Sequence, residues 1–208
     1  MHFLCSFRPL AESEHGRKAI ASFGLPPFVD ASCRREPDFE SQFPSITALC
    51  RCGSYAPRLG VGDSIVYITK KAQYPGIEEP HSRLVAILKV VATFQSHSSA
   101  ADWYRARQLP VPSNCIVFGN PPLPLEKTDR FYEDLNRWDA IYRLRAKTWG
   151  IFHVCEPLFR ELHHPPAINK ETMAGIFGCI PETRIPPSIP HQAYAEIQRV
   201  AQTGRSSD

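Results

Sequence analysis

The stretches "LGVGDSIVYITKK" (residues 59–71) and "RLVAILKVVATF" (residues 83–94) decide the fold that the sequence predicts. A Gly-Asp turn at Gly62 and Asp63 leads into β-branched and aromatic residues, a composition typical of a strand. The second stretch is almost continuously aliphatic, which predicts a strand buried on both faces, although its length also allows a helix. Pro-Gly and a further proline between them predict a loop, so we expect an antiparallel pair.

Short elements are predicted on both sides of this pair. Strands are expected at "HFLCSF", "NCIVFGN" and "IFHVCEP", and a strand or a helix at "SITALCR". Helices are expected at "SEHGRKAIASFG", "SHSSAADWYRARQL", "TDRFYEDLNRWDAIYRLRAKTWG" and "HQAYAEIQRVAQ". The 20 prolines among 208 residues indicate short elements joined by rigid connections rather than a helical bundle.

The composition narrows the class of protein. A hydrophobic content of 43% and a charged content of 22% are ordinary for a soluble globular protein. The net charge of +3 permits nucleic acid as a partner without arguing for it. The sequence shows no secretory leader and no apolar run of membrane-spanning length, and its seven cysteines form no disulfide framework. We therefore expect a cytoplasmic protein.

The segment "DASCRREPDFES" (residues 30–41) carries two arginines and four acidic residues around one apolar ring, that of Phe39. Such a density of donors and acceptors suits one wall of a pocket for a nucleobase or nucleotide. The alternative is a solvated charged loop or an internal ion-pair network. Of the two arginines, Arg34 is preferred over Arg35 as the ligand contact, although the sequence does not separate them.

The ordered set of motifs resembles the PUA-like superfamily, which includes the EVE, ASCH and YTH domains. Gly62-Asp63 and residues 86–90 occupy the places of that superfamily's turn and long strand. The set "DASCRREPDFE", "PSITALCR", "RLVAILKV", "WY" and "LPVPSNC" is most similar to the nucleotide-modification-associated branch, which is linked to DNA base hypermodification. The resemblance spans residues 1–125, and the Arg-Asn-Tyr sequence of EVE domains is missing after Asp30.

This resemblance implies an α+β fold, namely a PUA-like small mixed β-barrel with flanking helices. Because the character of the sequence changes near Thr128, we expect a barrel domain at residues 1–127. A helical C-terminal extension at residues 128–208 would then pack on the barrel. The resemblance also implies a concave site for a modified base or nucleotide in nucleic acid, in a DNA-modification or defence context.

The candidate site residues follow from the shape of a base, which has a flat face and a polar edge. The candidates for stacking are Phe39, Tyr67, Tyr74, Trp103 and Tyr104. The candidates for recognition of the edge or phosphate are Asp30, Ser32, Cys33, Arg34, Arg35, Ser113 and Asn114. Against these readings, aromatic residues at a short helix end are often core, and Ser and Asn often satisfy turn amides.

Two other functions stay open. An enzyme would use Cys33 as a nucleophile, with His97 or His153 as its base, or a set of Asp30, Arg34 and Glu36. An interaction protein would use an apolar face of the C-terminal helix, with no active pocket. Zinc held by Cys33, Cys50 and Cys52 with His81 or His97 is disfavoured, because Cys50-x-Cys52 is too tightly spaced. We expect a binding module without a catalytic residue, metal or cofactor.

Overall fold

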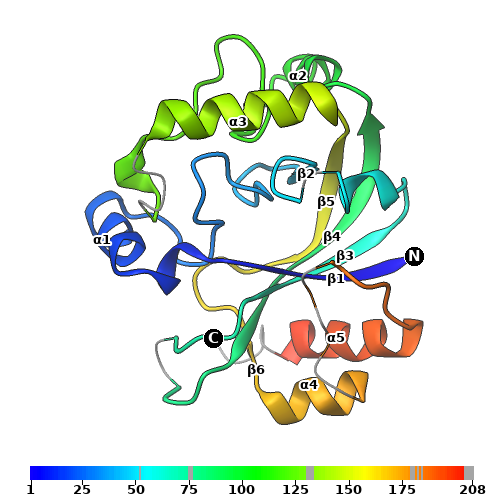
Figure 1. The fold of residues 1–208 in the computed structure, drawn as a ribbon. Helices are drawn as coiled ribbons and strands as arrows, with labels where there is room; N and C mark the ends of the chain where they lie inside the picture. Colours follow the sequence, from blue (N-terminus) through cyan, green and yellow to red (C-terminus); the bar gives the residue numbers. More distant parts are fainter. Residues whose placement is uncertain are drawn as a thin grey trace.

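The computed structural model describes residues 1–51, 53–74, 77–129, 134–178, 181, 183 and 185–203. Its strands are β1 (His2–Phe7), β2 (Ser45–Thr47), β3 (Ser64–Thr69), β4 (Ser82–Phe94), β5 (Phe152–Arg160) and β6 (Ala167–Ile168). They form one strongly curled sheet in the order β1-β3-β4-β5-β2, with β6 paired to β4 (Figure 1). β1 and β3 run parallel, and the other pairings are antiparallel, so the sheet is mixed.

The helices are α1 (Glu14–Phe23), α2 (His97–Arg105), α3 (Leu135–Thr148), α4 (Lys170–Phe177) and α5 (His191–Thr203), with short 3₁₀ turns at Leu10–Glu12, Ala56–Arg58 and Leu125–Lys127. Helix α1 begins where the Ser13 side chain accepts from Gly16 N, and it ends at Gly24, whose φ of +62° favours glycine. The predicted helices at these places are confirmed, except that α4 arises in a tail expected to be mostly loop. None of the helices in the described ranges is long and apolar enough to cross a membrane.

Both faces of the sheet are covered by apolar packing. On β1, Phe3, Cys5 and Phe7 pack on one side, while Leu4 faces a second cluster formed with α4 and α5. Side chains of β3 and β4 divide between the same two clusters, as the period of two in a strand requires. Figure 1 shows α4 and α5 on one side of the sheet and α3 on the other. This arrangement confirms the α+β class, the antiparallel pairing of β3 with β4, and the burial of β4 on both faces.

The chain beyond residue 128 contributes more than helices. Strand β5 lies between β4 and β2 in the sheet, so the strand expected at "IFHVCEP" is confirmed. The apolar residues of α5, among them Tyr194 and Ile197, are buried against the sheet. The apolar face of α5 is therefore occupied within the chain, and a protein partner at this helix stays a prediction. A domain boundary at residues 127/128 stays a prediction.

The segment "NCIVFGN" (residues 114–120) is not the strand that we expected. It forms turns, because side chains take up its backbone groups: the Ile116 amide donates to His97 Nδ1 (3.0 Å), and Arg34 donates to the Asn120 carbonyl (3.0 Å). β-Branched and aromatic residues favour a strand only where a neighbouring strand offers a ladder.

The polar loop, residues 30–41, lies between α3 and the sheet (Figure 1), and Arg34 anchors it there. The Arg34 guanidinium is fully buried and donates to Asp139 Oδ1 on α3 (2.8 Å from Nε) and to the carbonyls of Ser113 and Asn120 (3.0 Å each). Arg143 contacts the other oxygen of Asp139 at 2.7 Å, but its side chain is 47% exposed. The Asp139 carboxylate is thus shared by a buried arginine, Arg34, and a partly exposed one, Arg143.

We expect Arg34→Ala to lower the free energy of unfolding by about 3–5 kcal/mol, because Asp139 and two carbonyls would lose a buried partner. Arg143→Ala is the matched control, and it should cost about 1 kcal/mol or less because that ion pair is partly solvated. Urea unfolding of the two variants measures both values. Equal losses would contradict the anchoring role of Arg34.

Candidate ligand-binding site

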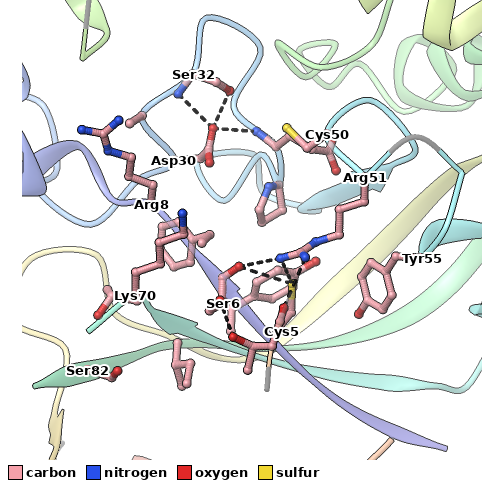
Figure 2. Close-up of a pocket in the computed structure, with 18 of the residues that line it drawn as sticks. Cys5, Ser6, Arg8, Asp30, Ser32, Cys50, Arg51, Tyr55, Lys70 and Ser82 are labelled. Atoms are coloured by element: carbon pink, nitrogen blue, oxygen red, sulfur yellow. Dashed lines mark hydrogen bonds between the residues drawn. The ribbon is translucent and has the colours of Figure 1, made fainter. Parts of the chain in front are cut away.

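A cavity of about 710 Å³ lies between the polar loop and the ends of β1 and β3 (Figure 2), and we call it the Asp30 cavity. Its volume falls within the range of ~300–1,000 Å³ that small-molecule sites occupy. The lining includes Cys5, Ser6, Phe7, Arg8, Asp30, Ser32, Glu36, Thr47, Cys50, Arg51, Tyr55, Tyr67, Thr69, Lys70, Lys71, Asp129 and Thr183. Apolar strand residues thus meet an unusual number of charged and hydroxyl groups.

Asp30 presents a buried carboxyl group whose oxygens differ. Oδ1 accepts from the Ser32 amide (2.9 Å), the Ser32 hydroxyl and the Glu36 amide (3.1 Å). Figure 2 shows these bonds converging on one oxygen. Burial raises the pKa of Asp30, and the bonds from Ser32 and Glu36 oppose that rise. The loop therefore fixes the carboxyl group in one orientation.

Glu36 places a second carboxyl group in the same cavity. It accepts from the amide and hydroxyl of Thr47 and from Asn114 Nδ2 (3.2 Å). Burial raises the pKa of Glu36 to about 8, against these bonds, and the nearby charge of Asp30 adds to the rise. Glu36 is therefore mainly protonated at neutral pH, which leaves Asp30 as the carboxyl group whose ionisation is the easier of the two.

Arg51 and Tyr55 form the opposite side of the Asp30 cavity. Arg51 donates to the Ser6 carbonyl (2.7 Å) and contacts Cys5 Sγ (3.4 Å). The Tyr55 hydroxyl is buried and has no hydrogen-bond partner within the described part of the chain. A buried hydroxyl without a partner costs free energy, so a ligand that bonded to it would be stabilised.

Cationic side chains surround the rim. Arg8 follows β1, and Lys70 and Lys71 follow β3, so the parallel register that pairs Phe7 with Thr69 brings them together. Both lysines are exposed, and no ion pair of either is found across the residues that the structure describes. In Figure 2, Arg8 and Lys70 lie on the same side of the cavity.

Of the residues that the sequence proposed for the ligand, the structure brings three into this cavity: Asp30, Ser32 and Tyr67. The other nine, which do not line it, are Cys33, Arg34, Arg35, Phe39, Tyr74, Trp103, Tyr104, Ser113 and Asn114. Sequence reasoning missed Arg8, Arg51, Tyr55, Lys70 and Lys71. For Arg8, Lys70 and Lys71 the sequence offered one signal, namely a cation directly after a predicted strand, and it offered none for Arg51 and Tyr55.

Two residues of the polar loop that lie outside the cavity have structural partners instead. Arg35, at φ +27°, donates to the Asp30 carbonyl and to the Lys127 carbonyl (3.0 Å). Phe39 packs edge-on against Phe7, with ring centroids 5.0 Å apart.

Three further candidates also have their contacts outside the cavity. Ser113 donates to Asp38 through its amide and its hydroxyl (2.8 Å each), and Asn114 accepts from the Ser45 hydroxyl (2.7 Å). Trp103 packs under the guanidinium of Arg107 at 4.0 Å. The alternative interpretation of the polar loop, an internal ion-pair and hydrogen-bond network, is therefore partly present.

The structure offers Cys33 little support as a nucleophile. Its side chain is buried beside Leu49 and Tyr142, and burial raises the pKa of its thiol to about 11. Burial also lowers the pKa of His97 to about 4, and neither His97 nor His153 lines the Asp30 cavity. Cys52 lies outside the described residues. Within them, no group of three or more His, Cys, Asp or Glu side chains is placed to hold a metal ion.

A second cavity of about 810 Å³ lies between the start of α2 and the end of α3. Its lining includes His97, Arg143 and Lys147, and none of the residues proposed from the sequence as ligand contacts. The two cavities share no lining residue.

Compared with protein-family models, the chain matches none, and a search of curated proteins also finds no match. The chemistry of the Asp30 cavity therefore has to be argued from the structure itself.

We expect the melting temperature to fall as the pH rises from 6.5 to 8, because below 6.5 the lowered pKa values of His97 and His153 act in the opposite direction. Above its ordinary pKa of 4.5, Glu36 releases its proton in the unfolded chain but keeps it in the folded protein up to about pH 8. Raising the pH through this window therefore favours the unfolded state.

Glu36→Gln should make this slope shallower, because glutamine carries no titratable proton in either state. Differential scanning calorimetry at several pH values gives the two slopes. Identical slopes would rule out a protonated Glu36.

Proposed function

We propose that the protein binds a nucleotide, or a modified base presented by a nucleic acid, in the Asp30 cavity. The observation that carries this proposal is the meeting of buried polar groups and rim cations around one space of about 710 Å³. A base needs a cavity with a polar edge, and its phosphate needs cations at the entrance. The resemblance to the nucleotide-modification-associated branch favours the same ligand class.

The interior groups suit the edge of a heterocycle. Asp30 offers a fixed acceptor, and the unpaired Tyr55 hydroxyl can donate or accept. Phe7 and Tyr67 supply aromatic surface in the lining. Because these groups are buried, each hydrogen bond to a ligand forms with little competition from water.

The rim suits a phosphate. Lys70 and Lys71 are exposed cations at the end of β3, and Arg8 lies beside them. Arg8 is partly balanced by Glu12 and Asp129, at 3.2 Å each, so the two lysines supply most of the excess positive charge. A phosphate there would form charge-assisted hydrogen bonds.

The protonation state of the cysteine thiols favours binding over catalysis. Burial raises the pKa of Cys5, which lines the cavity, to about 11, so a thiolate is disfavoured there as it is at Cys33. Asp30 and Glu36 are two buried carboxyl groups in the cavity with the chemistry for proton transfer, and they keep the enzyme alternative open.

The test is a binding screen against nucleosides, nucleotides, and modified and unmodified oligonucleotides, by thermal shift and titration calorimetry. A binding ligand should raise the melting temperature of the parent protein, and Asp30→Ala should lose that rise. Replacing Lys70 and Lys71 with alanine should weaken the binding of nucleotides about tenfold or more, equivalent to about 1.4 kcal/mol. The binding of nucleosides, which carry no phosphate, should be unaffected.

Lys89→Ala serves as the matched control, since Lys89 pairs with Glu156 away from the cavity. This variant should bind nucleotides as tightly as the parent protein does. Mass spectrometry of the recovered ligand distinguishes the enzyme alternative, because turnover would change its mass or release a base. If neither mononucleotides nor oligonucleotides bind, the proposed function is wrong.

A further inference from the structure

We propose that the Asp30 cavity selects bases with an exocyclic amino group, such as cytosine or adenine and their modified forms, over the matching bases with a carbonyl at that position. This proposal rests on the proposed function and adds its chemical preference. Asp30 is the residue that determines it.

The argument begins with the unequal oxygens of Asp30. Oδ1 already accepts hydrogen bonds from two backbone amides and the Ser32 hydroxyl. No hydrogen bond from any described residue reaches Oδ2, and Figure 2 shows that oxygen directed into the cavity. One oxygen thus holds the side chain in place, and the other is presented to a ligand.

Three donors to Oδ1 favour the ionised form of Asp30, and an ionised carboxylate oxygen can only accept a hydrogen bond. An amino group on a base donates to it, whereas a carbonyl oxygen would face it with lone pair against lone pair. A site built around a buried polar group rejects an analogue that leaves the group unpaired. The amino-bearing base should therefore bind at least tenfold more tightly than its carbonyl counterpart.

The neighbouring groups do not produce this preference themselves. The Tyr55 hydroxyl can rotate to donate or accept, so it satisfies either type of base. Glu36 already accepts from Thr47 and Asn114. Arg51, which can only donate, is engaged by the Ser6 carbonyl and Cys5 Sγ, so Asp30 Oδ2 is the buried acceptor that sets the preference.

Asp30→Asn gives a directional test. The amides of Ser32 and Glu36 can only donate, so the asparagine carbonyl oxygen must take the place of Oδ1. The asparagine amino group then occupies the place of Oδ2 and points a donor into the cavity. This substitution should reverse the preference toward bases with a carbonyl, with almost no change in side-chain volume.

The experiment measures dissociation constants by titration calorimetry for three matched pairs: dCMP and dUMP, 5-methyl-dCMP and dTMP, and dAMP and dIMP. The parent should prefer the first member of each pair at least tenfold, and Asp30→Asn should prefer the second. Glu40→Gln is the control, because Glu40 lies in the same loop but does not line the cavity. Its carboxylate pairs with Arg35 at 3.3 Å, so its removal should leave the parent's preference unchanged.

Equal affinities within the pairs, or a carbonyl preference in the parent, would overturn the amino preference while leaving the proposed function in place. An amino preference that persists in Asp30→Asn would remove Asp30 as its cause. Binding of none of the six nucleotides, nor of oligonucleotides that contain them, would overturn the proposed function and the preference together.

Discussion

The bonds of Arg34 to Asp139, Ser113 and Asn120 hold the polar loop against α3, and the position of every other loop residue depends on them. A fully buried guanidinium must have most of its donors paired, because an uncompensated buried charge is far more costly than an exposed one. Arg35 meets the same requirement through the carbonyls of Asp30 and Lys127. With both arginines engaged inside the protein, Asp30 and Glu36 face the cavity instead.

The cavity forms on the side of the loop that these two arginines leave to the carboxyl groups. Asp30 and Glu36 face the ends of β1 and β3, where the parallel register brings Arg8 beside Lys70. Burial raises the pKa of Glu36 to about 8, and the nearby charge of Asp30 adds a smaller part of that rise. The result is a site with one fixed acceptor, an uncharged neighbour and cations at its entrance, which suits a polar planar ligand better than an apolar one.

Local signals in the sequence carried much of the fold. The β-branched run of β3, the aliphatic run of β4 and the Ser13 and Gly24 ends of α1 depend on neighbouring residues, and these elements were predictable. The parallel pairing of β1 with β3 joins distant segments, so the meeting of Arg8 with Lys70 had no local signal. The strand β5 itself was predictable, but its place between β4 and β2 joins distant segments and had no local signal.

The candidate site was predictable only as a region. The charge density of the polar loop marked it correctly as a place of concentrated hydrogen bonding. Its irregular backbone, with Arg35 at φ +27°, has no repeating period to show which side chains face the cavity and which face α3. Asp30 and Arg34 are four residues apart and face different partners, a distinction that depends on Asp139, more than one hundred residues later.

The position of β5 has a consequence for the order in which this chain folds. β2 pairs with β5, and β4 pairs with β5 over most of its length, so contacts that close the sheet join residues about 60 to 110 positions apart. During synthesis the polar loop and β2 emerge long before the strand that completes their sheet, and β4 meanwhile exposes an open edge of apolar residues. A chain interrupted near residue 127 would keep that edge permanently, and we infer that aggregation would compete with its folding.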